Sequence, residues 1–221
     1  MTIHCLGGRI LEPELLDEAP PEPTRQNLRE LVTINRLLGG HRILLDRLGE
    51  LVQPDERFTF LDIGAASGDM AAVARRRFAG MVPINLDRRA LHLEQAATAV
   101  CGDAFRLPFA DRSVDVTHCS LFLHHFTNDQ VVALLKEMHR VARRAAIVQD
   151  LERNPLPYYF LPATRWLFRW SELVLHDGPI SVEAAFKAPE LQVLARLAGM
   201  GNVEVRTHRP AFRLSLLARR D

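Results

Sequence analysis

The chain has 221 residues and a formal net charge of +1, and hydrophobic residues make up 48% of it. This length suits one domain with a sizeable core, and the near-zero net charge predicts no general attraction to nucleic acid or to anionic membranes. The three cysteines, Cys5, Cys101 and Cys119, lack the spacing of a metal site and are expected to be reduced thiols. We find no signal peptide and no apolar run long enough to span a membrane, so we predict a cytoplasmic protein.

The N-terminal part of the chain is expected to stand outside the core fold. Residues 1–24 contain four prolines among acidic residues, which predicts an irregular arm. Two amphipathic helices follow, at about 28–38 and 41–52, with Gly39 and Gly40 between them. We therefore assign residues 1–56 to an arm and two cap helices, and residues 57–221 to the main domain.

From Phe58 onward, predicted strands and helices alternate. Strands are expected at 58–62, 82–86, 99–101, 114–119 and 145–149, with helices at 69–78, 89–98 and 128–141 between them. After an unusual segment, 155–186, come a helix at 189–198 and a hairpin of strands 203–207 and 212–217. This alternation predicts an α/β fold with a parallel sheet covered by helices on both faces.

A small-residue loop, Gly64 to Gly68, follows the first strand directly and leads into the helix that starts at Asp69. No Gly-Lys-Ser/Thr follows, which excludes a P-loop, and the glycine spacing does not fit the dinucleotide fingerprint. A plain strand-to-helix turn remains one interpretation. The acidic Asp62, two residues before Gly64, favours a ligand site at the end of the strand.

The run from Leu61 to Asp69, Leu-Asp-Ile-Gly-Ala-Ala-Ser-Gly-Asp, resembles the first motif of class I S-adenosylmethionine-dependent methyltransferases. It departs from that motif at Ala66, where the family has its middle glycine, and this leaves the affinity for the cofactor open. The resemblance implies a Rossmann-like sheet of seven strands whose last strand is antiparallel. The two N-terminal helices and a helical insertion after strand five are additions to that fold.

The resemblance also implies how S-adenosyl-L-methionine is held. Asp87, at the end of the second strand, corresponds to the acid that binds the ribose, and Asp103 with Ala104 corresponds to the adenine-binding corner. A solvated acid or a helix cap is the alternative interpretation of Asp87. The residues expected at the cofactor are Asp62, Gly64, Ala65, Ala66, Gly68, Asp87, Asp103, Ala104 and Ser120.

The residues after strand four, Ser120 to Phe126, exclude several types of methyl transfer. They lack the Asn/Asp-Pro-Pro-Tyr motif of amino-methylating members of the family. Cys119 has no neighbouring proline, which argues against cytosine C5 methylation. Ser120 stands where the metal-dependent catechol branch has a carboxylate, so we predict that no metal is needed.

Three histidines are candidate catalytic bases, because imidazole titrates near neutral pH. They are His124 and His125 after strand four, and His176 beside Asp177. Paired histidines at this position also occur in small-molecule methyltransferases without a proven catalytic role. An apolar wall around a true base is expected to lower its pKa and keep it unprotonated.

The segment 155–186 contains both tyrosines and both tryptophans of the chain within thirteen residues. We expect it to cap the acceptor, with Trp166 or Tyr159 lining the pocket. Two alternatives remain: a helix that only packs on the sheet, and an interfacial or partner-binding helix.

The sequence therefore predicts an enzyme that transfers a methyl group to a small, largely apolar acceptor, first of all a hydroxyl on an aromatic or polyketide-derived ring. C-methylation of a quinol-like ring and a non-catalytic cofactor-binding regulator are the alternatives. A loose similarity to bacterial quinone- and polyketide-pathway methyltransferases points the same way. No nucleic-acid partner and no transmembrane segment are expected, and the oligomeric state stays open.

Overall fold

The computed structural model describes residues 7–220, so Cys5 lies outside the described part of the chain. The strands are β1 (Phe58–Ile63), β2 (Met81–Asp87), β3 (Ala99–Cys101), β4 (Val114–Ser120), β5 (Ala142–Leu151), β6 (Asn202–His208) and β7 (Arg213–Arg219). The helices are α1 (Pro21–Leu37), α2 (Gly40–Gly49), α3 (Asp69–Arg77), α4 (Asn128–Val141), α5 (Pro155–Phe168), α6 (Glu172–Ala184) and α7 (Ala188–Leu197). Two short 3-10 turns, η1 (Leu15–Glu18) and η2 (Leu123–His125), complete the elements.

All seven strands form one sheet in the order β3-β2-β1-β4-β5-β7-β6. β1 to β5 pair in parallel, and β7 is antiparallel to both of its neighbours, β5 and β6. This arrangement confirms the predicted fold class, including the antiparallel last strand. It also brings the carboxyl ends of β1, β2 and β4 to one edge of the sheet, where ligands bind in open α/β folds.

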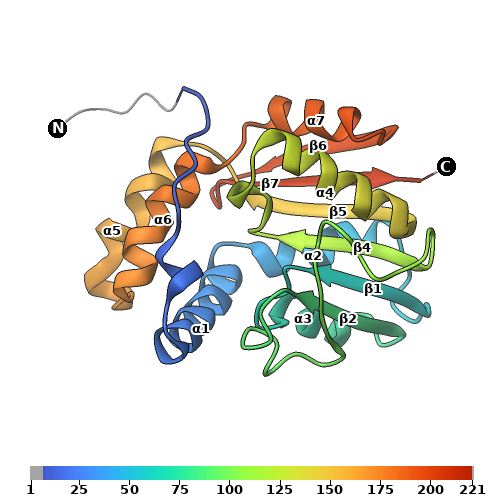
Figure 1. Ribbon diagram of the computed structural model, residues 1–221, viewed down its shortest axis with the longest axis horizontal. Helices are drawn as coiled ribbons and strands as arrows, with labels where there is room; N and C mark the ends of the chain where they lie inside the picture. The colour runs from blue at the N-terminus through green and yellow to red at the C-terminus, as the bar shows by residue number, and fades with distance from the viewer. Residues whose placement is uncertain (1–6, 221) are drawn as a thin grey trace.

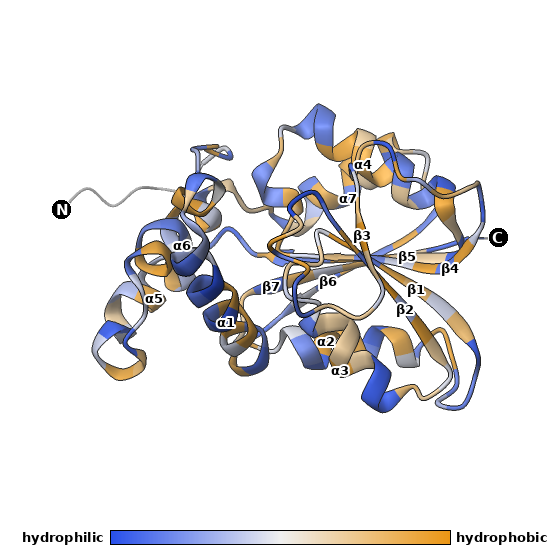
Figure 2. Cartoon of the chain, turned by 60° about the horizontal axis from the view of Figure 1, so that its bottom comes forward, coloured by the Kyte–Doolittle hydropathy of each residue, from blue (hydrophilic) through white to orange (hydrophobic). Residues whose placement is uncertain are grey.

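Helices cover both faces of the sheet. α4 and α7 lie on one face, and α2 and α3 lie on the other (Figure 1). Figure 2 shows the hydrophobic strands enclosed between these two helical layers. A large buried cluster that includes Leu61, Leu134 and Leu191 fills the first interface, and a second that includes Leu44, Phe60 and Ala74 fills the other.

The two predicted N-terminal helices have different positions. α1 lies beyond the carboxyl ends of the strands, whereas α2 packs against α3 and buries Leu44 and Leu48 in the core. α1 begins at Pro21, seven residues before the predicted start at residue 28. Pro21 and Pro23 lie in its first turn, where the missing N–H costs no helical hydrogen bond.

The predicted helix at 89–98 is wrong, because this stretch forms a series of turns. Its backbone bonds span three residues, as in the pair from the His92 N–H to the Arg89 carbonyl. The side chain of Asn85 binds the Ala97 carbonyl, and Thr98 has a left-handed φ of 54°. A stretch this short gains little from helix formation alone, so these tertiary contacts determine its shape.

The unusual segment 155–186 forms two helices, α5 and α6, joined by a short turn. α5 is farthest from the sheet, and α6 lies between it and the rest of the molecule (Figure 1). Trp170 in the turn packs on Ile34 of α1 and Val174 of α6. α1, α5 and α6 thus form a helical layer over the carboxyl end of the sheet.

The N-terminal arm crosses this helical layer and is held at defined points. Arg9 donates to the carbonyls of Ala184 and Phe126, at 2.6 and 2.8 Å. The carboxylate of Asp177 accepts from the backbone N–H groups of Leu15 and Leu16, at 2.9 and 3.1 Å. Residue 14, between these anchors, therefore has a fixed place beside η2.

Candidate active site

Two adjoining cavities lie between the sheet edge and the helical layer. The larger one, of about 690 Å³, follows the carboxyl ends of β1, β2 and β4. The smaller one, of about 370 Å³, lies between α1, α5, α6 and the turn before β7. We call them the cofactor cavity and the acceptor cavity.

Eight of the nine residues that the sequence assigns to the cofactor line the cofactor cavity. They are Asp62, Gly64, Ala65, Ala66, Asp87, Asp103, Ala104 and Ser120. Gly68 is the exception: it caps the start of α3 with a left-handed φ of 71°. It therefore shapes the loop and does not line the cavity.

Two polar oxygens in the cofactor cavity have no hydrogen-bond partner within the described protein. They are Oδ2 of Asp62 and Oγ of Ser120, both buried. The other oxygen of Asp62 pairs with Nδ1 of His118 at 2.7 Å, and burial raises the pKa of Asp62 above its usual value despite that contact. Buried polar atoms normally have partners, so these two oxygens are suited to a bound ligand.

Asp87 is held rigidly at the end of β2. Its Oδ1 accepts from the Arg89 N–H at 2.9 Å, and its Oδ2 accepts from the Ala66 N–H at 3.1 Å. Burial alone would raise the pKa of Asp87, but hydrogen bonds from His92 and these backbone groups outweigh it and lower the pKa. Oδ1 also lies 3.3 Å from Nδ1 of His92, whereas Oδ2 retains a further lone pair for a hydroxyl donor.

The loop between β1 and α3 brings backbone close to this cavity. Gly64 has a φ of 65°, and a Cβ there would lie 2.5 Å from the ring of Phe122, so only glycine fits. Ala66, at the position of the family's middle glycine, adopts a φ of 47°. The alanine therefore takes the backbone conformation that a glycine would take, and its N–H still reaches Asp87.

The acceptor cavity is mainly apolar. Its walls come from Leu31 and Ile34 of α1 with Leu38 just after that helix, and from Phe160 and Leu161 of α5, together with residues of α6 and of the turn before β7. Its polar lining includes Glu14, Asp177, Ser181, His124 and His125. A largely apolar molecule with one polar group matches this distribution.

Four residues line both cavities: Leu16, Leu31, Leu121 and His125. His125 is the one titratable residue in this shared wall. Its side chain is 29% exposed, so it is accessible from the cavities. The structure therefore places one predicted base at the junction of the two cavities.

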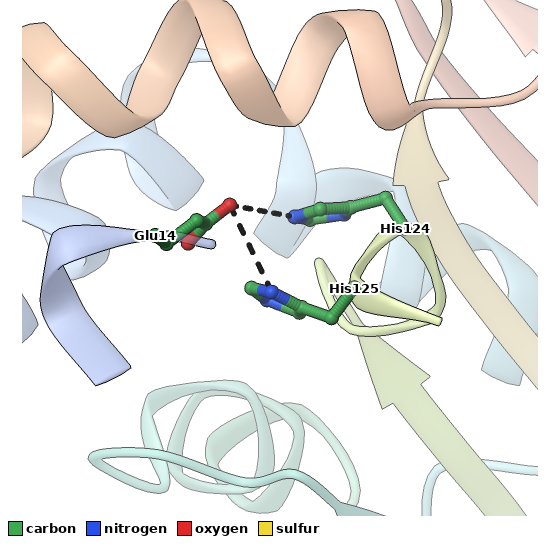
Figure 3. A group of neighbouring side chains, drawn as sticks. All are labelled: Glu14, His124 and His125. Atoms are coloured by element: carbon green, nitrogen blue, oxygen red, sulfur yellow. Dashed lines mark ion pairs between the residues drawn. The ribbon is translucent and has the colours of Figure 1, made fainter. Parts of the chain in front are cut away.

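Glu14 joins the two histidines at this junction (Figure 3). Its Oε1 lies 3.7 Å from Nε2 of His124 and 3.8 Å from Nδ1 of His125. The two imidazole rings lie 4.4 Å apart between centroids. The sequence analysis missed Glu14, because an acid 110 residues before the histidines carries no local signal of their contact.

The expected role of His124 as a free base is wrong. Its Nδ1 contacts Oδ1 of the buried Asp150 at 2.6 Å, and its backbone N–H donates to the same carboxylate. Burial alone would lower the pKa of His124, but Asp150 and Glu14 raise it to about 10, opposite to the expected direction. His124 is therefore a protonated link between two carboxylates.

Glu14 is charged for the corresponding reason. Burial would raise its pKa, but the neighbouring His124 and His125 lower the pKa of Glu14 to about 2. The pair of Glu14 and His124 therefore stays ionised at neutral pH.

We expect the protonation of His124 to be visible in a pH titration. Its pKa is raised from 6.5 to about 10, so its contribution to stability is complete below pH 6.5 and disappears as the pH rises through 10. The imidazole ¹⁵N shifts of His124 should remain those of an imidazolium at pH 8. The stability of wild type should fall from pH 6.5 to 10 more than that of His124→Gln, and neutral imidazole shifts at pH 7 would contradict the assignment.

His176 is not placed as a catalytic base. It lines neither cavity, its side chain is 48% exposed, and its Nδ1 contacts the neighbouring Asp177 at 2.9 Å. The α6 helix turns Asp177, and not His176, toward the acceptor cavity.

The expectation that Trp166 or Tyr159 lines the pocket is also wrong. Their side chains are on the outer face of α5, where the residues are 78% and 50% exposed. The inner face of the same helix lines the cavity with Pro157, Phe160 and Leu161.

Glu14, His124 and His125 have a geometry that could hold a metal ion, since one ligand atom from each lies within 4.8 Å of the others. Their charges are already compensated, because His124 pairs with both Glu14 and Asp150. We therefore retain the prediction that no metal is needed. Activity should be unchanged in a chelator, and its loss with recovery on adding a divalent cation would show that these side chains bind a metal.

The sheet order and the acid-lined cavity at the carboxyl ends of β1, β2 and β4 define a Rossmann-like methyltransferase fold. Residues 61–148 match a family model described as a methyltransferase domain. An uncharacterized methyltransferase of Synechocystis is 28% identical, with 80% of this chain and 81% of the relative covered. A demethylmenaquinone methyltransferase of Roseiflexus is 33% identical over 49% of this chain and 48% of its own length.

A solved structure of the plantazolicin methyltransferase, bound to a substrate analogue and to the demethylated cofactor, has the same fold. It has a TM-score of 0.68 at 14% identity, with 93% of each chain covered. The methyltransferase domain at residues 61–148 and the relatives named as methyltransferases support a class I S-adenosylmethionine-dependent methyltransferase, and the solved structure shows the same fold.

Proposed function

We propose that this enzyme methylates a hydroxyl group on a small, largely apolar acceptor, most specifically on an aromatic or polyketide-derived ring. The observation that carries the proposal is the position of His125, the titratable residue in the wall shared by the cofactor and acceptor cavities. A hydroxyl in the acceptor cavity would have a base at the boundary where the methyl group is delivered.

The cofactor cavity provides matching groups for S-adenosylmethionine. Asp87 would accept the ribose hydroxyls, Asp103 and Ala104 would bind the adenine, and the unpartnered oxygens of Asp62 and Ser120 would face the methionine part. When bound, S-adenosylmethionine supplies a methyl group activated by the positive charge on its sulfur. For the rest of the reaction, the protein has to position the acceptor and to remove the proton of its hydroxyl group.

His125 is proposed to remove the hydroxyl proton. Its Nδ1 faces Glu14, so a hydrogen on Nδ1 leaves Nε2 as the basic atom. As Nε2 takes the proton, the ring gains a positive charge next to the ionised Glu14 carboxylate, which stabilises it. Asp150 and His124 hold Glu14 and η2 in place for this step.

The apolar walls of the acceptor cavity orient the ring and exclude water. Leu31, Leu121 and Leu16 form the rest of the shared wall, so an acceptor there meets hydrocarbon on the sides that His125 does not occupy. A correctly oriented ring removes much of the entropic barrier to transfer.

C-methylation of a quinol-like ring is the second candidate. The relative named as a demethylmenaquinone methyltransferase favours it. The same cavity and base would serve, because an electron-rich ring carbon also needs an apolar site and a proton acceptor.

The test is product analysis with purified protein, S-adenosylmethionine carrying a ¹³C-labelled methyl group, and a panel of phenols and quinols. We expect a single added methyl whose ¹³C shift is that of a methoxy group. A ring-methyl shift would favour C-methylation, and cofactor binding without any product across the panel would favour a non-catalytic binding protein.

A further inference from the structure

The outer face of α5 exposes an unusual amount of hydrophobic surface. Within this helix of 14 residues, Tyr159, Trp166 and Leu167 are 50, 78 and 58% exposed. Leu156 is also exposed but lines the acceptor cavity, and Phe168 stacks on Trp170. No residue of α5 is buried, although the helix is rich in aromatic and aliphatic side chains. Such a concentration of exposed hydrophobic side chains is typical of an interaction surface.

The charged side chains of the α5 segment itself have one sign. Residues 154–171 contain two arginines and no acidic residue. Arg165 and Arg169 are exposed at the C-terminal end of α5, beside Trp166 and Phe168, and neither has an ion pair with a described residue. The α5 segment is therefore hydrophobic and positive, although the net charge of the whole chain is only +1 and Glu30 lies at its C-terminal end.

The same helix is also the outer wall of the acceptor cavity. Pro157, Phe160 and Leu161 on its inner side line that cavity, while Tyr159 and Trp166 are on its outer side. α5 is the outermost helix of this layer (Figure 1), and it thus lies between the apolar cavity and the surroundings of the protein.

We propose that the exposed face of α5, formed by Tyr159, Trp166 and Leu167, docks on a lipid bilayer with anionic headgroups. The helix lies in the interface, with its aromatic side chains at headgroup level and Arg165 and Arg169 on the lipid phosphates. None of the described helices is long and apolar enough to cross a membrane, so this contact is peripheral. The apolar acceptor then enters the cavity from the bilayer past α5, a step that rests on the proposed function.

A bilayer fits this surface better than a second copy of the chain. A helix of 14 residues is about 21 Å long and presents one narrow strip, whereas stable protein interfaces use about 20–30 residues on each side. Anionic headgroups complement both the positive charge and the aromatic side chains.

The experiment is co-sedimentation of the purified full chain with vesicles of phosphatidylcholine, with and without phosphatidylglycerol. Wild type should bind the anionic vesicles, and the emission of Trp166 should shift to shorter wavelength, since the other tryptophan is already buried. Trp166→Glu combined with Leu167→Glu should lower binding at least tenfold. Arg165→Gln and Arg169→Gln should each lower binding to the anionic vesicles about fivefold and leave binding to neutral vesicles unchanged.

The matched control places the same charges on α7, as Val193→Glu with Leu197→Glu, at positions that are 54 and 63% exposed. An equal loss of vesicle binding in this control would overturn the proposal. Wild-type protein that does not bind anionic vesicles would also overturn it. A wild-type dimer in light scattering that the α5 variant converts to a monomer would assign the surface to a second copy. Methylation of a water-dissolved phenol, measured without vesicles, tests the proposed function separately.

Discussion

Replacing His125 with alanine should lower turnover on an un-ionised phenol by about a hundred- to ten-thousandfold, the usual contribution of general-base catalysis. His125 is the titratable residue shared by the two cavities, and the ionised Glu14 lies 3.8 Å from its Nδ1. Single-turnover rates with saturating cofactor would measure the effect. The affinity for S-adenosylmethionine should change little, because a base acts after binding.

The matched control is His176→Ala, which removes a histidine that lines neither cavity. Its turnover should stay near that of wild type. The turnover of His125→Ala should fall less on acceptors that are already ionised at the assay pH, because they have lost their proton before methyl transfer begins. Normal turnover of His125→Ala on an un-ionised acceptor would show that positioning alone drives transfer.

Asp87→Ala should weaken cofactor binding about ten- to a hundredfold. The change removes a carboxylate that can accept charge-assisted hydrogen bonds from the ribose, a loss of about 1.5–3 kcal/mol. Titration calorimetry with S-adenosylmethionine and with its demethylated product would measure it.

Asp111→Ala is the control for Asp87→Ala, because Asp111 is an exposed acid that pairs with Arg140 away from the cavity. It should bind the cofactor like wild type. A thermal melt of both variants would separate a lost ligand contact from a loosened loop, since Asp87 also holds the backbone of Ala66 and Arg89. If Asp87→Ala binds the cofactor as tightly as wild type, the assignment of Asp87 to the ribose is wrong.

The sheet was predictable because its signals are local. The first two strands contain short apolar runs, and the acids near their carboxyl ends, Asp62 and Asp87, directly follow those runs in the sequence. Parallel strands bring such residues to one edge, so the lining of the cofactor cavity followed from topology. α4 has its predicted bounds, since Thr127 and Gln130 form a capping box and an apolar stripe follows.

The acceptor site was less predictable because its contacts join distant segments. Glu14 reaches the histidines because Asp177 and Arg9 hold the arm in place, and the sequence shows none of these contacts. His124 has a raised pKa because Asp150, at the end of another strand, is buried against it. The orientation of α5 was also hidden, since both faces of that helix are hydrophobic.

The most direct test of the account is to fill the acceptor cavity from α5. Leu161 lines the acceptor cavity alone, so Leu161→Trp should raise the KM for the acceptor at least tenfold or abolish transfer, with cofactor affinity within about twofold of wild type. Ala163→Trp, an exposed position on the same helix, should behave like wild type. Unchanged acceptor kinetics in Leu161→Trp would contradict the claim that the acceptor binds between α1, α5 and α6.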